Sequence, residues 1–284
     1  MPFSDNGNIS YSRPVADLWD DLLACLDLDP LPGGDAFAGK NLPLGYHRLF
    51  GGQLIGQFVA AALLTCADSG KSVKSLHVLF PREGRADEPV RYTVERHHDG
   101  GTFATLAVTA RQSRGVIATG SVSMHAAEEG PARQDTAPVR ERPADVPEAS
   151  LSLLPFEARS EVSLDAPEAA PAQYSLWIRT PPASPRLAPA LAAYATDLTL
   201  IGTALRAVAG VSQADAGSAF ASAVTSHTVW FHRPFRTDDW LLLRQVSPVL
   251  AHGRCFGRGD ILTADGTLVA SYAQEALLRL GARG

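Results

Sequence analysis

The chain has 284 residues, of which 45% are hydrophobic and 19% are charged, with 25 Lys and Arg against 30 Asp and Glu. This composition belongs to globular proteins, and the length is enough to bury a large core without a disulfide or a structural metal. A formal net charge of −5 provides no basic surface for nucleic acid and is poorly suited to an anionic membrane surface.

The cysteines and the N-terminus indicate the compartment. The three cysteines, Cys25, Cys66 and Cys255, are widely spaced and form no CxxC pair, which argues against both a disulfide framework and a zinc site. Residues 1–8 are polar and lack the charged start and apolar core of a secretory signal. The most apolar stretch, residues 54–67, is too short to cross a bilayer. We therefore expect a cytoplasmic protein with no stable membrane anchor.

The first half reads as helices followed by an antiparallel meander. Residues 14–28 carry leucines at helical spacing, which predicts an amphipathic helix on the outside of a domain. Residues 50–67 (FGGQLIGQFVAAALLTCA) are apolar on nearly every side, which predicts a helix that is buried all round. Four strand-like runs separated by turn signals follow, at residues 74–83, 89–100, 102–115 and 116–125.

The middle of the chain differs in composition from both halves. Residues 126–172 are dense in proline, alanine and charge without sustained periodicity, which indicates a linker. Parts of it, such as LSLLPF, hold enough apolar residues to pack on the domains.

The second half repeats the first in the same order. Residues 194–208 predict an apolar helix, and strand-like runs follow at residues 227–235, 238–248, 253–263 and 266–278. An offset of 151 positions sets residues 77–82 against residues 228–233 and Gly115 against Gly266. The duplication predicts two similar domains. We place an N-terminal domain with its leading amphipathic helix at residues 1–128, the linker at 129–173 and a C-terminal domain at 174–284.

Most motifs of well-known enzyme classes are missing. The sequence has no G-x-G-x-x-G, Walker loop, H-E-x-x-H or G-x-S-x-G. The pairs His97 with His98 and His227 with His232 could suggest metal ligands, but neighbouring strand residues face opposite ways and no acidic or cysteine partner completes a metal spacing. We expect no metal site.

Two polar residues in apolar surroundings are candidates for chemistry. Asp197 lies at the start of the predicted second-half helix, where it could be an N-cap, a base that activates water, or both. Gln274 lies in the last predicted strand and shares a face with Ala270 and Tyr272. It is either a surface residue or, if it points inward, an amide that must be hydrogen-bonded and can hold a water or polarise a carbonyl.

Six runs occur in an order that carries a family resemblance: FGGQLIGQ, SLHVLFPREG, VERHHDGGTF, YATDL, HTVWFHRPF and DGTLVASYAQEALLR. From about residue 15 to residue 280 the chain resembles the acyl-CoA thioesterase II family. The resemblance implies an α+β double-HotDog fold, with two tandem helix-wrapped antiparallel β-sheet domains. It also implies hydrolysis of acyl-CoA thioesters to free fatty acid and CoA without a metal or organic cofactor. We further expect a homo-oligomer.

The same resemblance assigns the family's catalytic Asp to Asp197 and its catalytic Gln to Gln274. The family's third residue is a Thr or Ser six positions before the Trp of the W-F-H-R-P motif. Here that position is Val224, and Thr225 is its neighbour. Either a one-residue bulge lets Thr225 supply the hydroxyl, or Asp197 and Gln274 hold the water alone.

Two glycines begin the first buried helix, at positions that correspond to the start of the second-half helix. Gly51 and Gly52 are expected either to let a thioester carbonyl approach the helix N–H groups or to permit close packing. The comparison suggests that the second half supplies the acid and the amide, and that the first half supplies surface and backbone.

Two functions follow from these residues. The first is acyl-CoA hydrolysis by water that Asp197 activates, with Gln274 and possible help from Thr225. The alternative is a catalytically weak acyl-CoA or acyl-lipid binding protein of the same fold, which Val224 favours. A HotDog dehydratase or hydratase is disfavoured because no histidine motif of that kind accompanies the helix.

Overall fold

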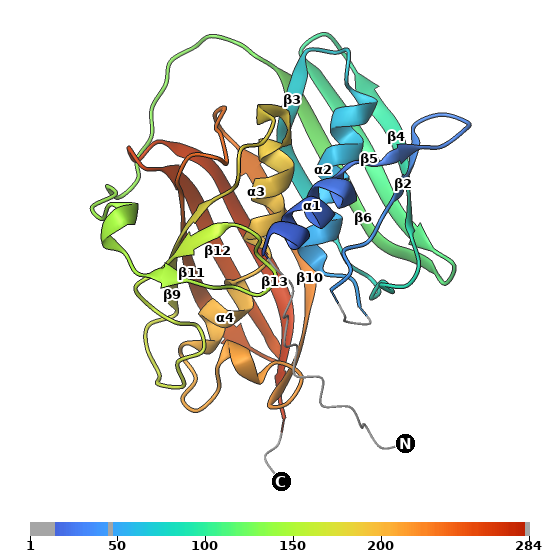
Figure 1. Ribbon diagram of the computed structural model, residues 1–284. Coiled ribbons are helices and arrows are strands. Elements are labelled where there is room, and N and C mark those ends of the chain that lie inside the picture. The colour runs from blue at the N-terminus through green and yellow to red at the C-terminus, as the bar shows by residue number, and fades with distance from the viewer. Residues whose placement is uncertain (1–14, 45–47, 282–284) are drawn as a thin grey trace.

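The computed structural model describes residues 15–44 and 48–281, and it consists of two similar halves (Figure 1). The first half contains α1 (Val15–Leu26), β1 (Asp29–Pro30), β2 (Ala36–Gly39), α2 (Gly51–Thr65), β3 (Lys71–Leu79), β4 (Val90–Asp99), β5 (Phe103–Gln112) and β6 (Gly115–Ala126). The second contains η1 (Pro143–Asp145), β7 (Glu148–Ala149), β8 (Glu157–Arg159), β9 (Gln173–Arg179), η2 (Pro185–Leu187), α3 (Ala188–Thr196), α4 (Leu200–Leu205), η3 (Gln213–Asp215), β10 (Phe220–Phe231), β11 (Leu241–Ala251), β12 (Arg254–Thr263) and β13 (Leu268–Leu280).

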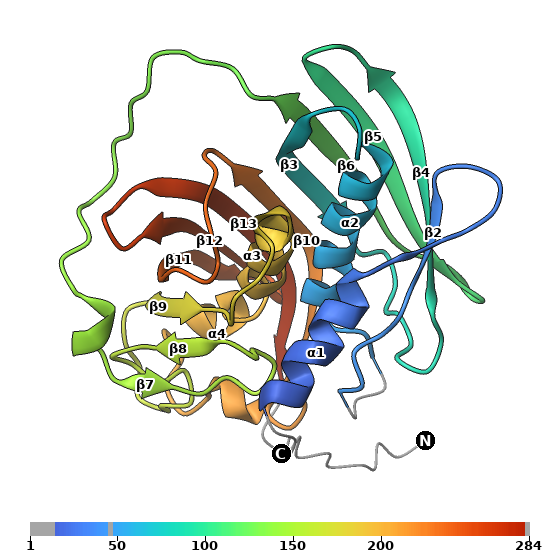
Figure 2. The ribbon, with the colours of Figure 1, turned by 45° about the horizontal axis from the view of Figure 1, so that its top comes forward.

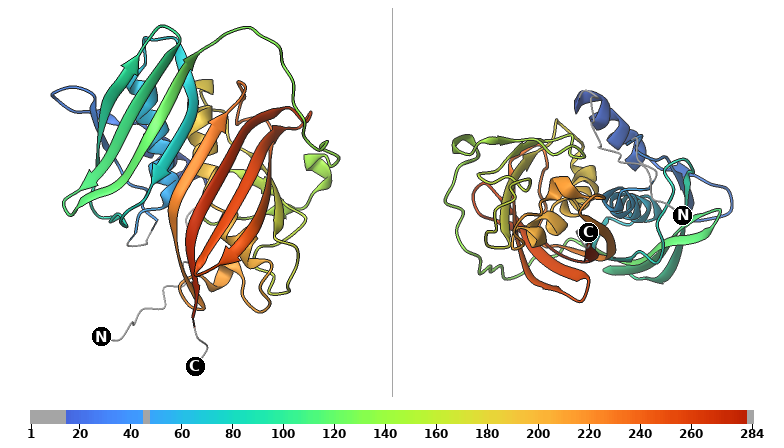
Figure 3. Two further views of the ribbon diagram at one scale, coloured as in Figure 1. Left: turned by 180° about the vertical axis from the view of Figure 1, so that it is seen from behind. Right: turned by 90° about the horizontal axis from the view of Figure 1, so that it is seen from below.

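All described strands belong to one 13-stranded sheet, in the order β1-β2-β4-β5-β6-β3-β10-β13-β12-β11-β9-β8-β7. The two halves join edge to edge where β3 pairs with β10 in antiparallel register, with Leu79 opposite Ser226 and Ser75 opposite Trp230. Seen from behind, the strands of both halves run across one surface, with the helices on its other side (Figure 3). This architecture is the expected α+β double HotDog.

The helix α2 is the centre of the first half. Its residues are apolar or small and nearly all are buried, as the sequence predicted. Strands β3 to β6 curve around it, and the view from below shows it end-on inside the sheet (Figure 3). Its other side packs along α3 (Figure 1). The first turn of α2 therefore lies beside residues of the second half.

The helix α1 confirms the first sequence prediction over its described residues; Pro14 and the polar residues 1–8 lie outside them. It packs on α2 (Figure 2), and its Leu22 is fully buried. Its Trp19 meets the ring of Phe156 edge-on, with centroids 5.8 Å apart. The helix thus bridges α2 and the segment before β8.

A bulge occurs at the same place in both halves. The pairing of β3 with β6 shifts between Val73 and Ser75, and the pairing of β10 with β13 shifts between Val224 and Ser226. The unpaired residues, Lys74 and Thr225, are 151 positions apart, which is the offset of the sequence repeat. The duplication thus reproduces a local irregularity as well as the strands.

The segment that the sequence indicated as a linker runs from β6 across to the second half (Figure 1). Residues 127–142 are irregular, and Gln134 fixes them to β13 by accepting from the N–H of Leu268 and donating to the carbonyl of Gly266. The later part forms β7 and β8, which extend the sheet beside β9 (Figure 2). The linker composition therefore covers an irregular crossing and two short edge strands.

The predicted helix over residues 194–208 is wrong in its bounds. The chain forms α3 from Ala188, breaks after Thr196, and resumes as α4 at Leu200. Proline at the first turn is compatible with a helix start, so the proline-rich stretch before residue 190 conceals a helix that begins earlier than expected. Residues Pro185–Leu205 are apolar and long enough to cross a membrane, but 78% of the apolar window is buried inside the protein, as in a core helix.

Candidate active site

The carboxylate of Asp197 lies at the break between α3 and α4. Asp197 is the C-terminal cap residue of α3 and only 5% exposed. Its carboxylate accepts a hydrogen bond from the backbone N–H of Gly52, in the first turn of α2. The prediction that Asp197 caps its own following helix is therefore wrong: Thr199 holds that position, and the acid meets the N-terminus of a helix in the other half.

The surroundings of Asp197 set its acidity. Burial raises the pKa of this carboxyl from 3.8 to about 7, because the charged form loses its hydration, and the Gly52 N–H opposes the rise. A carboxyl with a pKa near neutrality can accept a proton and release it again at physiological pH.

The two glycines at the start of α2 permit this approach. A Cβ on Gly51 would lie 2.7 Å from Oδ2 of Asp197, and one on Gly52 would lie 2.5 Å from the carbonyl oxygen of Tyr194. Both distances are closer than side chains tolerate, so the glycines allow the carboxylate and the α3 backbone to touch α2. The Gly52 N–H, considered for a thioester carbonyl, is engaged by Asp197.

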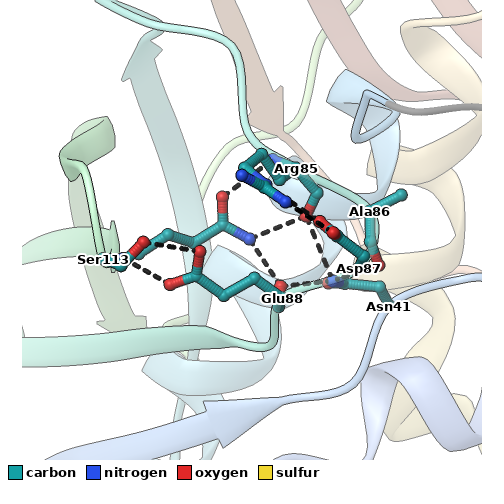
Figure 4. Close-up of polar contacts among 7 residues, drawn as sticks. Asn41, Arg85, Ala86, Asp87, Glu88 and Ser113 are labelled. Carbon is teal, nitrogen blue, oxygen red and sulfur yellow. Dashed lines mark hydrogen bonds and ion pairs between the residues drawn. The ribbon is translucent and has the colours of Figure 1, made fainter.

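Two amide side chains, the buried Gln53 and the half-buried Asn41, hold the first turn of α2 in place. Gln53 accepts from the N–H of Leu42 at 2.9 Å and donates to Oδ1 of Asn41 at 2.9 Å. Asn41 donates in turn to the carbonyls of Ala86 at 3.0 Å and Glu88 at 2.6 Å (Figure 4). The turn that carries Gly51 and Gly52 is therefore tied to the loop before β4.

Further bonds close that loop onto the turn between β5 and β6. The Glu88 carboxylate accepts from both the N–H and the hydroxyl of Ser113, and Gln112 bonds the backbone of Arg85 (Figure 4). Arg85 itself pairs with Asp87. This polar cluster therefore supports the first turn of α2, whose Gly52 N–H binds Asp197.

Gln274 points inward from β13 and is 3% exposed. It lies opposite His227 of β10, and its Oε1 is 2.7 Å from Nδ1 of that ring. The other ring nitrogen, Nε2, lies 2.9 Å from the hydroxyl oxygen of Thr196. Thr196 precedes Asp197, so a chain of contacts joins the segments that carry the acid and the amide.

Two polar atoms of this group have no hydrogen-bond partner within the described part of the chain: Oδ1 of Asp197 and Nε2 of Gln274. Buried polar groups are nearly always hydrogen-bonded, so such atoms mark a place where a polar ligand can bind. A water can supply the donor that the Asp197 oxygen requires and the acceptor that the Gln274 nitrogen requires.

Comparison with known proteins identifies the family. The acyl-CoA thioesterase N-terminal domain model matches residues 41–125, and the C-terminal domain model matches residues 128–278. The chain is 29% identical to "Acyl-CoA thioesterase 2" of Haemophilus influenzae, covering 93% of this chain and 99% of that protein. It is 33% identical to the acyl-CoA thioesterase II TesB2 of Mycobacterium marinum, with a TM-score of 0.76 over 93% of this chain and 98% of that one.

The chain belongs to the acyl-CoA thioesterase II family. A protein of Alicyclobacillus acidocaldarius described as having a HotDog fold also superposes, with a TM-score of 0.73 at 20% identity, over 92% of this chain and 98% of that one. The family and fold expected from the sequence are therefore confirmed.

Val224, at the position where the sequence resemblance expected a Thr or Ser, lies at the β10 bulge. Val224 is opposite Ala276, which is buried two positions from Gln274, and residues directly opposite share a face. Thr225 is the extra residue of the bulge, and its hydroxyl donates to the carbonyl of Glu275 at 2.9 Å. Val224 thus shares the inner face with Gln274, and the hydroxyl of Thr225 bonds the backbone of the next strand.

The sequence interpretation missed the connection through Thr196 and His227. His227 was weighed only as a metal ligand with His232, whose Nε2 instead lies 3.0 Å from the hydroxyl oxygen of Ser271. No cluster of three or more metal-binding side chains occurs within residues 15–44 and 48–281. Pairing the predicted strands would have placed His227 beside Gln274.

Proposed function

We propose that this thioester hydrolase cleaves acyl-CoA to free fatty acid and CoA, with Asp197 as the base that activates the attacking water. The observation that carries the proposal is the buried Asp197 carboxylate, which has one oxygen on the Gly52 N–H and the other without a partner among the described residues. The amide of Gln274 is joined to the same segment through His227 and Thr196.

In the proposed reaction the water is held between Asp197 and Gln274. Asp197 takes one proton as the water oxygen attacks the thioester carbon, and the C–S bond breaks as the tetrahedral intermediate collapses. The proton then passes to the departing CoA sulfur, so that one water and one thioester give one acid and one thiol. A base with a pKa of about 7 suits both steps, because it accepts and releases the proton near neutral pH.

Binding without efficient turnover is the second candidate function, and one observation favours it. Val224 occupies the inner-face position of the family hydroxyl and cannot donate or accept a hydrogen bond. A protein with this site would still bind the acyl chain and CoA. Location in the cytoplasm and assembly into a homo-oligomer stay predictions.

A cavity of about 410 Å³ is a candidate place for the acyl chain. Leu18, Leu44 and Phe156 are among its apolar lining residues, and the charged Glu148, Glu157 and Arg159 line it as well. Phe156 also packs against the ring of Tyr194, one turn before Asp197 on α3, with centroids 6.3 Å apart. An acyl chain directed from Asp197 toward this cavity would leave water, with a gain of about 0.8 kcal/mol for each methylene buried.

Release of CoA thiol from acyl-CoAs of increasing length, from acetyl to dodecanoyl, tests the function at pH 8. We expect turnover above the spontaneous rate, with kcat/KM rising with chain length and then levelling when the cavity is full. Binding of dodecanoyl-CoA without thiol release would support the binding protein instead. Equal kcat/KM for acetyl-CoA and dodecanoyl-CoA would argue against an apolar chain site.

Exchanging the hydroxyl at the bulge tests the third catalytic partner. If Thr225 acts on the water, Thr225→Val lowers kcat by roughly tenfold to a hundredfold, the value of one charge-assisted hydrogen bond. Val224→Thr is nearly isosteric and then has little effect. The reverse pattern, in which Val224→Thr raises kcat and Thr225→Val is neutral, would assign the water to Asp197 and Gln274 alone in this chain. Circular dichroism of both variants checks that the strand pairing is unchanged.

A further inference from the structure

The ring of His227 is buried between the segments that carry Asp197 and Gln274, and the proposed reaction gives it no role. It is 1% exposed, and each ring nitrogen lies within hydrogen-bond distance of one described side chain. Nδ1 lies 2.7 Å from the Gln274 side-chain amide, and Nε2 lies 2.9 Å from the Thr196 hydroxyl oxygen. Which nitrogen carries a proton decides which way the Gln274 amide must face.

The hydrogen bond that the Thr196 hydroxyl donates determines whether Nε2 of His227 carries a proton. The hydroxyl donates to the carbonyl oxygen of Ala193 at 2.8 Å, and a carbonyl can only accept. A hydroxyl has a single proton, so Thr196 has none left for His227. The ring must therefore donate from Nε2 to the Thr196 oxygen.

The remaining ring nitrogen must then accept. Burial lowers the pKa of His227 to about 4, against the opposing hydrogen bond to Gln274, so the ring is neutral at physiological pH and has one N–H. With that proton on Nε2, the atom of Gln274 nearest Nδ1 has to be the amide nitrogen. A half-turn about the last torsion of Gln274 exchanges Nε2 and Oε1 in nearly the same space.

The opposite arrangement makes fewer bonds. If Nδ1 carried the proton, Nε2 would accept from Thr196, and the Thr196 and Ala193 oxygens would face each other at 2.8 Å without a proton between them. That leaves two hydrogen bonds where the first arrangement makes three. A buried network of this kind favours the fully bonded state.

We propose that His227 is a positioning residue that turns the amide of Gln274 so that its oxygen, and not its nitrogen, faces the water at Asp197. This inference rests on the proposed function. Asp197 and Gln274 then both accept from the water, which engages both of its protons and leaves a lone pair for the thioester carbon. The second acceptor thus orients the nucleophile that the first one deprotonates.

Nitrogen NMR at pH 8 of the whole protein labelled with ¹⁵N-histidine shows which ring nitrogen of His227 carries the proton. The chain has eight histidines, and the resonance of His227 is the one lost in His227→Asn. We expect a protonated Nε2 and an unprotonated Nδ1. A protonated Nδ1, alone or together with Nε2, would overturn the proposal.

Kinetics of matched variants test the consequence. His227→Phe fills the space without an acceptor, and we expect kcat to fall roughly 10- to 100-fold with KM little changed, as for misplacement of a catalytic group. His227→Asn offers Gln274 an amide oxygen near the position of Nδ1 and should restore most of kcat. The control is His232→Phe, outside the site, which should leave kcat unchanged.

Thr196→Val keeps the proposal testable if His227→Phe does not fold. Without the hydroxyl, Nε2 loses its acceptor, so the proton should move at least partly to Nδ1 and kcat should fall about tenfold. An unchanged tautomer and unchanged kcat in this variant would overturn the proposal, as would full activity of folded His227→Phe. If the parent protein releases no CoA, the proposed function fails, whereas an active parent with the wrong tautomer contradicts only the role of His227.

Discussion

Asp197→Asn should lower kcat by at least two orders of magnitude, because an amide cannot take a proton from water at neutral pH. Asn is nearly the same size as Asp and can still accept the hydrogen bond from the Gly52 N–H. The substitution should therefore lower the rate without weakening acyl-CoA binding. Calorimetry with a nonhydrolysable thioether analogue measures that binding. The exposed Asp239→Asn is a matched control with no expected change in kcat.

The same variant should be more stable than the parent at pH 8. The pKa of Asp197 is 3.8 in the unfolded chain and about 7 in the folded protein. Between these two pH values the folded protein therefore keeps a proton that the unfolded chain has released. Its contribution to stability therefore falls as pH rises from about 4 to 7 and stays lost above 7. The introduced amide has no charge to bury, so the variant should gain on the order of a few kcal/mol at pH 8 and little at pH 4.

Thermal melts of parent and variant at pH 4, 6 and 8 measure this gain. A Tm difference that does not grow with pH would mean that burial does not disfavour the charged form of the Asp197 carboxyl. Retained turnover in Asp197→Asn would leave Asp197 with a structural role only.

Gly51→Ala and Gly52→Ala should have different effects, although the two glycines are neighbours. The Cβ on Gly51 meets the Asp197 carboxylate, a side-chain end that can rotate away. Alanine also suits a helix better than glycine, so stability should change little. The displaced carboxylate should lower kcat by roughly 10- to 100-fold, because small misplacements of a catalytic group are costly.

The Cβ on Gly52 meets atoms that cannot rotate away so readily. The Tyr194 carbonyl oxygen would lie 2.5 Å from it, and the ring of Phe50 would lie closer still. Overpacking of this kind costs about 1–3 kcal/mol, so Gly52→Ala should lower the Tm by several degrees. Melting curves and kcat of the pair separate the two effects. Equal loss of Tm in both variants would show that Gly51 serves only the packing of α2 against α3.

The sequence predicted the parts of the fold that depend on local pattern. The buried helix at residues 50–67 corresponds to α2 (Gly51–Thr65), and the strand-like runs correspond to β3 to β6 and β11 to β13. The run at residues 227–235 covers only the last part of β10 (Phe220–Phe231), whose first seven residues were not predicted. Apolar periodicity and turn residues are enough for such elements. They were not enough for α3, whose first residues follow a proline-rich stretch.

The candidate site was predictable by residue type but not by contact. Asp197 was expected to bind the N-terminus of the helix that follows it. It instead binds the N-terminus of α2, at Gly52, which lies 145 positions earlier in the chain. No local pattern reports a contact at that separation. The orientation of Gln274 was left open because alternation along β13 shows which residues share a face but not which face is buried. Pairing with β10 decides it, through His227.

The two copies of the repeat are joined in one chain and pair through β3 and β10, so their sequences can differ at corresponding positions. In a dimer of identical single units, every substitution appears twice and both sites must remain alike. Joined in one chain, the copies are free to specialise. The second retains the acid and the amide, while the counterpart of Gln274 in the first is Ser123, on the strand next to β3. The first copy instead contributes the N-terminus of α2, which carries a partial positive charge and whose Gly52 N–H donates to Asp197 of the second copy. The two copies thus differ at the candidate site, and they remain alike in the strands that hold them together.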